Sequence, residues 1–350
     1  MRAWVIRKKG CPVQEALRLE SDYPTPTASP GRVLIKVHAV AMNPVNWKLV
    51  ETWGLNRMQK VPGVPESDVA GTVVDGDLQG TGLQVGDAVF GLVPAEHTAK
   101  TGQGCLAEYV TVDKHLLTKK PDNVSFEEAA TFPLATFTAM NSLISTGGLR
   151  KGANQRVFIN GGSGGVGVYA VQIARAYDAY VVTTCSSASR ELVQSLGPDE
   201  ILDYKERPLV EQLKAKFSGD NKFDIVFDAA TGDADLYHQS PAYLKPKGMF
   251  VDVVGPQQHL KHGYVGLLRA FGDMLNRLVR PSFLGGTPRK YKLVMMKPTK
   301  PELEEMADLI RQEKLKPIVD EVFKFEEAVP KAYERQKSGR SKGKVVIKVQ

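Results

Sequence analysis

The feature that most constrains the fold is a glycine-rich turn set between an apolar strand and an apolar helix. Residues 157–159 form a β-branched and aromatic run that stops at Asn160, and glycines follow in the pattern G-x-G-x-x-G over 162–167. Residues 168–176 then repeat apolar side chains at helical spacing. This order is the signature of a dinucleotide-binding βαβ unit, although a glycine-rich surface turn is the simpler alternative. The residues expected to offer the cofactor's pyrophosphate their backbone are Ser163, Gly164, Gly165 and Val166.

The strand that follows indicates which dinucleotide binds. Residues 179–185 read as a buried parallel strand ending about 20 residues beyond the glycines, where an NAD-specific site places an acidic residue. This chain has small hydroxyl residues and a guanidinium there, with no acid before Glu191. Such groups suit a 2′-phosphate, so NADPH is the expected cofactor; alternatively, the serines cap a helix beginning near Ala188. The residues concerned are Ser186, Ser187, Ser189 and Arg190.

Length and composition are those of a two-domain globular protein. The chain has 350 residues, of which 42% are hydrophobic and 24% charged, and no apolar run approaches the roughly 18 residues of a membrane span. The first residues, 1–6, already resemble a strand and leave no room for a signal peptide, so a cytoplasmic location is expected. The three cysteines are too scattered for a disulfide framework or a cysteine-rich zinc lobe.

Positive charge is concentrated in one stretch. The net charge is +7, and between His259 and Lys300 nine basic residues stand against Asp273 alone. Such a stretch could attract nucleic acid, an anionic membrane or an acidic partner. More often, such a stretch is a solvent-exposed face of the protein or part of a phosphate-binding site, and we favour this interpretation. Binding to nucleic acid or to a membrane is less favoured.

The pattern of apolar residues and the density of Gly and Pro divide the chain into three segments. Residues 1–124 contain short strands punctuated by Gly and Pro, typical of a compact β-barrel-like domain. A capping-box pattern at Ser125 opens a helical stretch that breaks at Pro133, and strands then alternate with helices through 296, as in a doubly wound parallel sheet. Residues 297–350 contain two helices and two strands. The strands expected in the alternating segment are 157–159, 180–184, 200–202, 223–227, 249–254 and 291–296.

This order of segments resembles the medium-chain dehydrogenase/reductase superfamily. Motifs that carry the resemblance are Asn43-Pro-Val-Asn-Trp-Lys48, Val85-Gly-Asp-Ala-Val-Phe-Gly91, the glycine turn and the closing Ser338-Gly-Arg-Ser-Lys-Gly-Lys344. It is similar in particular to the zinc-free branch that contains quinone-oxidoreductase-like and enoyl-reductase-like proteins. The resemblance implies an α/β protein with a GroES-like, β-rich catalytic domain and a Rossmann domain.

At the zinc-ligand positions of related alcohol dehydrogenases, this chain has an amide and hydroxyls. Asn43 stands where a thiolate is expected, Ser67 where a histidine is expected, and Thr136 and Thr138 near the third position. Amides and hydroxyls are poor zinc ligands at neutral pH, so no metal site is expected.

The resemblance also implies roles for individual residues. Asn43, Lys48 and Thr138 would be catalytic, with Lys48 contacting cofactor or substrate and Thr138 holding the nicotinamide amide. The alternatives are a surface lysine beside a core tryptophan for Lys48 and a helical threonine bonding its own backbone for Thr138. Further substrate contacts would be Asn46, Trp47 and Thr136, and further cofactor contacts Tyr204, Val254 and Lys344.

Without a metal ion to act as a Lewis acid, the site is expected to reduce hydride acceptors that are already electrophilic. Quinones and α,β-unsaturated carbonyl compounds accept hydride at carbon, and hydrogen-bond donors can stabilise the charge that develops on oxygen. We therefore expect an NADPH-dependent reductase of such compounds. The alternatives are a trans-acting enoyl reductase of a polyketide pathway and a cofactor-bound protein that binds nucleic acid or a membrane. The edge strand 291–296 could also pair two copies into a homodimer.

Overall fold

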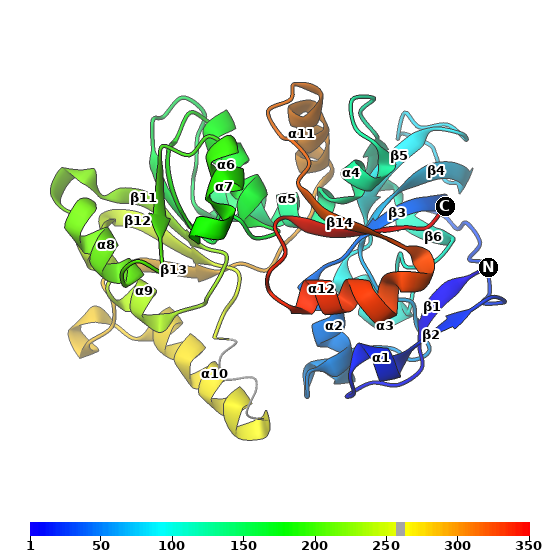
Figure 1. The fold of residues 1–350 in the computed structure, drawn as a ribbon, viewed down its shortest axis with the longest axis horizontal. Helices are drawn as coiled ribbons and strands as arrows, with labels where there is room; N and C mark the ends of the chain where they lie inside the picture. Colours follow the sequence, from blue (N-terminus) through cyan, green and yellow to red (C-terminus); the bar gives the residue numbers. More distant parts are fainter. Residues whose placement is uncertain (257–262) are drawn as a thin grey trace. The chain divides into compact units, whose positions relative to one another are not determined.

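The structure is a computed structural model that describes residues 1–256 and 263–350, without the side chains of residues 263, 264, 267 and 282 (Figure 1). The contacts divide the chain into two units, Met1–Phe137 with Pro298–Gln350, and Thr138–Lys297. The first boundary differs from the position 124/125 expected from sequence texture, because helix α4 (Phe126–Ala130) packs on strands of the first unit. Each unit is described by itself.

The first unit is built on a mostly antiparallel seven-stranded sheet. The strands run in the order β14-β15-β3-β4-β5-β7, with β6 paired to β3, and only β14 and β15 are parallel to each other. A separate hairpin joins β1 and β2. The strands are β1 (Ala3–Ile6), β2 (Leu17–Glu20), β3 (Arg32–Ala41), β4 (Asp68–Gly76), β5 (Ala88–Leu92), β6 (Tyr109–Asp113), β7 (Leu117–Lys119), β14 (Val319–Lys324) and β15 (Lys344–Lys348).

Alternation along the central strand shows why this sheet forms. In β3 the β-branched side chains of Val33, Ile35 and Val37 are buried and the residues between them are partly exposed, which matches the period of two of a strand. The capping box expected at Ser125 is present at the start of α4, with both reciprocal hydrogen bonds. The helices of this unit are α1 (Val13–Ala16), α2 (Pro44–Glu51), η1 (Leu55–Arg57), α3 (Ala95–Thr101), η2 (Lys114–Leu116), α4, α5 (Pro133–Met140, which crosses the boundary), α11 (Lys300–Arg311), η9 (Phe325–Glu327), η10 (Ala328–Ala332) and α12 (Tyr333–Lys337).

The second unit is a doubly wound parallel sheet, which confirms the expected fold class. Its strand order is β10-β9-β8-β11-β12-β13, and in Figure 1 α6 and α7 cover one face while α8 and α9 cover the other. The order reverses between β8 and β11, the position at which such sheets bind ligands. The strands are β8 (Arg156–Asn160), β9 (Tyr180–Cys185), β10 (Glu200–Asp203), β11 (Phe223–Asp228), β12 (Leu244–Asp252) and β13 (Lys290–Leu293).

Aromatic side chains fill much of the core beneath this sheet. Phe158, Phe217 and Phe223 are almost fully buried, and their rings contact one another. Burying a side chain of this size contributes roughly 1.5–3 kcal/mol relative to leaving it exposed. The helices are η3 (Asn141–Thr146), α6 (Gly167–Ala176), η4 (Ser187–Ser189), α7 (Arg190–Ser195), α8 (Leu209–Lys216), η5 (Gly219–Asn221), α9 (Ala234–His238), η6 (Ser240–Ala242), α10 (Gly263–Val279) and η8 (Ser282–Leu284).

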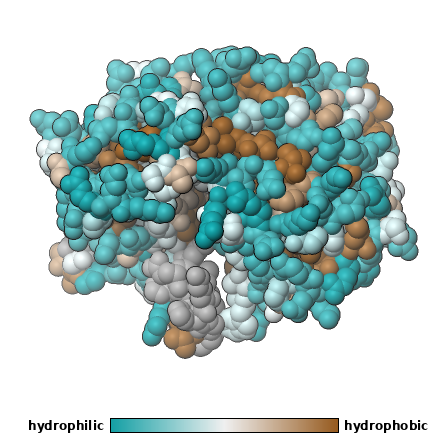
Figure 2. Space-filling model, viewed as in Figure 1, coloured by the Kyte–Doolittle hydropathy of each residue, from teal (hydrophilic) through white to brown (hydrophobic). Residues whose placement is uncertain are grey.

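The edge strand β13 is shorter than the expected strand 291–296. It ends at Leu293, Met295 is 78% exposed, and the backbone of Lys297 instead donates to the side chain of Asn141. The apolar run therefore continues past the sheet. The face seen in Figure 2 is largely hydrophilic, with hydrophobic side chains gathered in a few patches. Among the described residues, no helix is long and apolar enough to span a bilayer.

Candidate cofactor site and active site

The glycine turn follows β8 and is tied to the neighbouring strand β9. The backbone N–H of Gly161 donates to the Thr184 hydroxyl, and that of Gly162 donates to the Thr184 carbonyl, both at 2.8 Å. Gly161 has φ +94°, a conformation that favours glycine. The turn is thereby fixed at the carboxyl end of the sheet before α6 begins.

The three glycines of the motif serve two different purposes. A Cβ on Gly167 would lie 1.9 Å from the carbonyl oxygen of Gly161, and one on Gly162 would lie 2.3 Å from the Thr183 hydroxyl. Gly164 is different, since its Cβ would meet nothing closer than 3.4 Å. Gly167 is therefore required by the turn itself and Gly162 by the packing of the turn against β9, whereas Gly164 leaves space open beside it.

Unpaired N–H groups surround that open space. Within residues 1–256 and 263–350, the backbone N–H groups of Ser163, Gly165 and Val166 have no protein acceptor. They stand at the start of α6, where the helix dipole also favours negative charge. A pyrophosphate group fits this arrangement, and the four residues expected from the sequence are brought together here.

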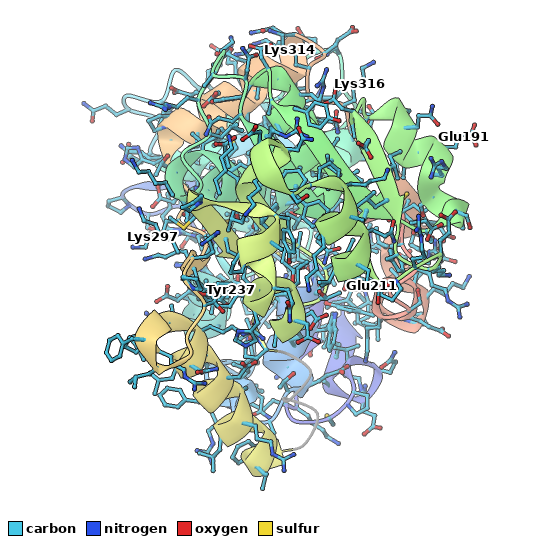
Figure 3. The ribbon with its side chains drawn as sticks, turned by 90° about the vertical axis from the view of Figure 1, so that its left-hand side faces the viewer. Glu191, Glu211, Tyr237, Lys297, Lys314 and Lys316 are labelled. Carbon is cyan, nitrogen blue, oxygen red and sulfur yellow. The ribbon has the colours of Figure 1, made fainter. Side chains whose placement is uncertain are left out.

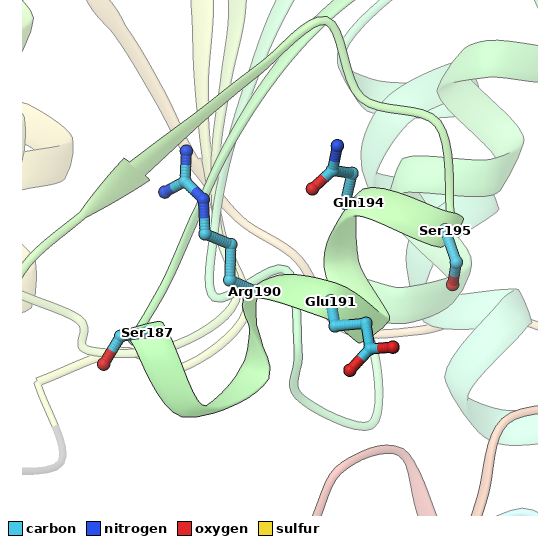
Figure 4. Close-up of a pocket in the computed structure, with 5 residues that line it drawn as sticks. All are labelled: Ser187, Arg190, Glu191, Gln194 and Ser195. Carbon is cyan, nitrogen blue, oxygen red and sulfur yellow. The ribbon is translucent and has the colours of Figure 1, made fainter.

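A shallow hollow lies beyond the end of β9, at the position expected to distinguish NADPH from NADH (Figure 4). Arg190 and Gln194 extend from one side of the η4–α7 segment, and Glu191 extends from the other. Ser186 and Ser189 make no side-chain cap on these helices, so the capping alternative is not observed. The residues that line the hollow are Ser187, Arg190, Glu191, Gln194 and Ser195.

Two further residues that were expected to contact the cofactor differ in their exposure to solvent. Ser189, expected among the cofactor contacts, is buried, so little of its surface is available to a ligand. Tyr204 directly follows β10 and is half exposed, so its side chain is accessible to a ligand.

Two aspartates that sequence reasoning missed shape the other loops of this edge. Asp228 ends β11, and its carboxylate accepts the backbone N–H groups of three following residues, Ala230, Thr231 and Gly232. Asp252 ends β12 in the same way and accepts from Val254 at 2.7 Å. In the sequence, an acidic residue ends each of these two apolar strands, and this signal could have identified both aspartates. The hydrogen bond from Val254 to Asp252 holds Val254 in a loop at the ligand-binding edge of the sheet.

In the first unit, the buried ammonium of Lys344 lies at the centre of a cluster of polar side chains. Lys344 on β15 donates to the Asn43 side-chain oxygen and lies 3.1 Å from Asp68 at the start of β4. Asn43 in turn donates to Asp68 at 2.9 Å, and Asp68 also accepts the backbone N–H of Leu134. Burial raises the pKa of Asp68, although the Lys344 ammonium opposes the shift. All three side chains are almost fully buried.

The cluster contains two residues that were expected in the functional site. Lys344 was expected to contact the cofactor, and its ammonium donates to Asn43 and Asp68. Asn43 was expected to stabilise charge on the substrate, and both ends of its amide have partners inside the first unit. Both expectations stay predictions.

Glu66 anchors a second part of the cluster. Its carboxylate accepts from the backbone of Asn43, the side chain of Asn46 and the hydroxyl of Tyr333. Burial raises its pKa to about 7, against the lowering effect of these hydrogen bonds. Its φ is +71°, a left-handed conformation that is costly for a residue with a Cβ. Asn46, which was expected to contact the substrate, is buried and also accepts from the Ser67 hydroxyl.

Four further side chains were expected to contact the substrate or the cofactor. Lys48 is partly buried with its ammonium 5.6 Å from the centre of the Trp47 ring, and burial lowers its pKa. Among the described residues, the Trp47 indole N–H and the Thr136 hydroxyl are buried and make no hydrogen bond. Thr138 is also largely buried and belongs to the second unit.

Comparison with protein families assigns both parts of the chain. Residues 29–122 match the family described as alcohol dehydrogenase GroES-like domain, and residues 196–347 match the one described as zinc-binding dehydrogenase. The second segment contains none of the positions 43, 67, 136 and 138.

Similar proteins align over the whole chain. The mitochondrial NAD(P)H oxidoreductase RTN4IP1 of Danio rerio is 31% identical, over 100% of this chain and 91% of that protein. The trans-enoyl reductase pgmF of Aspergillus terreus is 30% identical, over 100% and 96%. Among solved structures, the quinone oxidoreductase from Coxiella burnetii superposes with a TM-score of 0.78 at 26% identity, covering 100% of this chain and 99% of that one.

Proposed function

This chain belongs to the medium-chain dehydrogenase/reductase superfamily, and we propose that it is an NADPH-dependent reductase of quinones or α,β-unsaturated carbonyl compounds that works without zinc. Membership makes it an oxidoreductase with a nicotinamide cofactor. The acceptor, the preference for NADPH and the independence from zinc are our proposal. The observation that carries it is the buried cluster of Asn43, Asp68 and Lys344.

The cluster does not fit a zinc ion. A catalytic zinc needs thiolate, imidazole or carboxylate ligands, whereas the corresponding positions carry the Asn43 amide and the hydroxyls of Ser67 and Thr136. The Asp68 carboxylate, which accepts from the Asn43 amide, already faces the ammonium of Lys344 at 3.1 Å. A second cation beside that ammonium would be repelled, because like charges a few ångströms apart in a buried site interact strongly.

The preference for NADPH is supported by the hollow after β9. Arg190 provides a planar guanidinium, and Ser186 and Ser187 provide hydroxyls, at the level where the 2′-phosphate of NADPH is expected. Residues 185–190 contain no carboxylate, and Glu191, which also lines the hollow, extends from the other side of the η4–α7 segment than Arg190. An acid that would accept from the ribose of NADH therefore does not stand beside Arg190.

We assign the stabilisation of the product to Lys48. When bound, the cofactor supplies hydride to the acceptor, and negative charge then develops on the acceptor's oxygen. Lys48 is suited to hold the proton that neutralises this oxygen, because its lowered pKa makes its ammonium a stronger acid than an exposed lysine.

A panel of acceptors tests the proposal. Purified protein should oxidise NADPH with simple quinones and enones, and should do so far more efficiently than it oxidises NADH. Turnover restricted to saturated ketones and alcohols, or equal efficiency with both cofactors, would contradict it.

A second candidate is a trans-acting enoyl reductase that acts on a carrier-bound thioester. The similarity to pgmF over the full chain and the Asn43–Lys48 motif favour this reading. Adding a crotonyl thioester to the panel separates the two. Higher kcat/KM with the thioester than with any quinone would favour this candidate.

A further inference from the structure

Helix α10 carries its apolar side chains on the outside. Six large apolar residues recur at spacings of three and four positions, which places them on one face of the helix. They are between 46% and 64% exposed, whereas Gly266, Ala270 and Arg277 on the opposite face are buried. In Figures 1 and 3, α10 stands out as a rod from the sheet of the second unit. The outward side chains are Val265, Leu268, Phe271, Leu275, Leu278 and Val279.

A buried ion pair holds the helix in this orientation. The guanidinium of Arg277 is fully buried, donates to Asp273 at 2.7 Å and to the Gly232 carbonyl at 2.9 Å, and lies 3.5 Å from Asp252. Rotating the apolar face inward would pull Arg277 out of this site and leave Asp252 without its cation. The outward apolar face is therefore fixed by the structure of the second unit.

The apolar surface continues beyond the helix. Phe283 and Leu284, in the turn that follows α10, are 83% and 59% exposed. A monomeric soluble protein rarely leaves this many large apolar side chains together on its surface without a partner.

Charge around this surface points to an anionic partner. Residues 263–300 contain eight basic residues and a single acid, Asp273, so this stretch carries a net +7, equal to the net charge of the whole chain. Asp273 is paired with Arg277, whereas Arg269 on the helix and Arg280 just after it are exposed. Lys290, Lys292 and Lys297 add exposed positive charge on and after strand β13.

We propose that α10 and the turn after it dock the second unit on the surface of an anionic phospholipid membrane. An interfacial helix buries an apolar face at the level of the headgroups, is flanked by basic residues and does not span the bilayer. α10 meets each of these requirements. A nucleic acid would use the charge but leave the apolar face uncovered. A second copy would cover the apolar face but bring two strongly positive segments together.

Co-sedimentation with vesicles tests this inference, and it does not depend on turnover. The full chain should bind vesicles of phosphatidylcholine with phosphatidylserine and not vesicles of phosphatidylcholine alone, and added salt should weaken the binding. The double variant Phe271→Ser/Leu275→Ser should lose at least about tenfold in affinity, because two large side chains no longer enter the lipid. Val85→Ser, an exposed apolar residue in the first unit, is the matched control and should change nothing.

A charge variant provides a second arm. Arg269→Glu should weaken binding to the anionic vesicles by about tenfold or more, since each unit of charge near the surface contributes roughly 1 kcal/mol and the reversal changes two. Lys151→Glu makes the same change of charge at an exposed site elsewhere in the second unit and should have little effect. An unchanged cofactor affinity and melting temperature in every variant would establish that the variants are folded.

Three results would overturn the inference. The first is equal binding of the parent to neutral and anionic vesicles, or no binding to either. The second is heparin binding that is as tight as vesicle binding and insensitive to the Phe271/Leu275 change, which would indicate a nucleic-acid surface. The third is a dimer in solution that the same double variant converts to a monomer, which would assign the face to a second copy.

Discussion

Arg190 is the residue on which the proposed preference for NADPH depends most. It is exposed and lines the hollow after β9 together with Ser187. Arg190→Ala should weaken NADPH binding about tenfold or more, because a charge-assisted hydrogen bond contributes about 1.5–3 kcal/mol, and should leave NADH binding nearly unchanged. Fluorescence titration with both cofactors measures this, and Arg150→Ala, at an exposed site outside the hollow, is the control. An equal loss for both cofactors would remove the 2′-phosphate role.

Lys48 should set the alkaline limit of activity. The pKa of its ammonium is lowered from its usual value near 10.5 by burial, so the proton it holds is lost at a lower pH than in an exposed lysine. We expect kcat/KM for a quinone to fall as pH rises through this pKa. Lys48→Arg should move the fall to higher pH, because a guanidinium stays protonated. The exposed change Lys60→Arg should leave the profile alone, and an unshifted profile in Lys48→Arg would contradict the assignment.

Glu66 should make stability depend on pH. Its pKa in the folded protein is about 7, above the value near 4.5 of an unfolded chain. Between these values the unfolded state loses its proton and the folded state keeps it, so stability falls as pH rises from about 4.5 to 7 and then levels off.

Glu66→Gln removes this dependence, because an amide is neutral throughout. Relative to the parent, the variant should gain on the order of 3 kcal/mol between pH 4.5 and 8, as measured by denaturant unfolding. Glu211→Gln, an exposed change on α8 (Figure 3), should run parallel to the parent. A constant difference between Glu66→Gln and the parent across this range would show that the carboxyl is ionised in the folded protein at low pH.

The turn before α6 allows packing to be separated from ligand binding. Gly164→Ala adds a methyl group into open space, so it should preserve the melting temperature while weakening cofactor binding. Gly167→Ala forces a methyl group against the Gly161 carbonyl, so it should lower both. Equal effects of the two substitutions on stability would contradict the division of roles.

Local elements were largely predictable from the sequence, because their signals are contiguous. The glycine turn, the capping box at Ser125 and the strands of the parallel sheet follow from short-range pattern. The orientation of α10 did not follow, since apolar residues at helical spacing look the same whether they face inward or outward. What decides it is Arg277, whose partners Gly232 and Asp252 lie 45 and 25 residues away. The end of β13 also escaped prediction, because apolar residues continue beyond it.

Across the whole chain, the cluster around Asp68 was the part that sequence reasoning could not assemble. Asn43 and Asp68 are 25 residues apart, but Lys344 is 276 residues from Asp68 and reaches it only because β15 pairs with β3. Asn43 and Lys344 were singled out from the sequence for separate roles, and Asp68 was not singled out. No local signal in a basic carboxyl-terminal motif indicates that the fold buries one of its lysines beside a carboxylate.

Independence from zinc is the central claim, and one measurement tests it directly. The rate of NADPH-driven quinone reduction should be followed in protein of known metal content, before and after exhaustive treatment with a chelator. We expect far less than one zinc per chain and an unchanged rate, because the ammonium of Lys344 already supplies the positive charge beside Asp68. One tightly held zinc per chain, whose removal abolishes turnover and whose return restores it, would contradict the account.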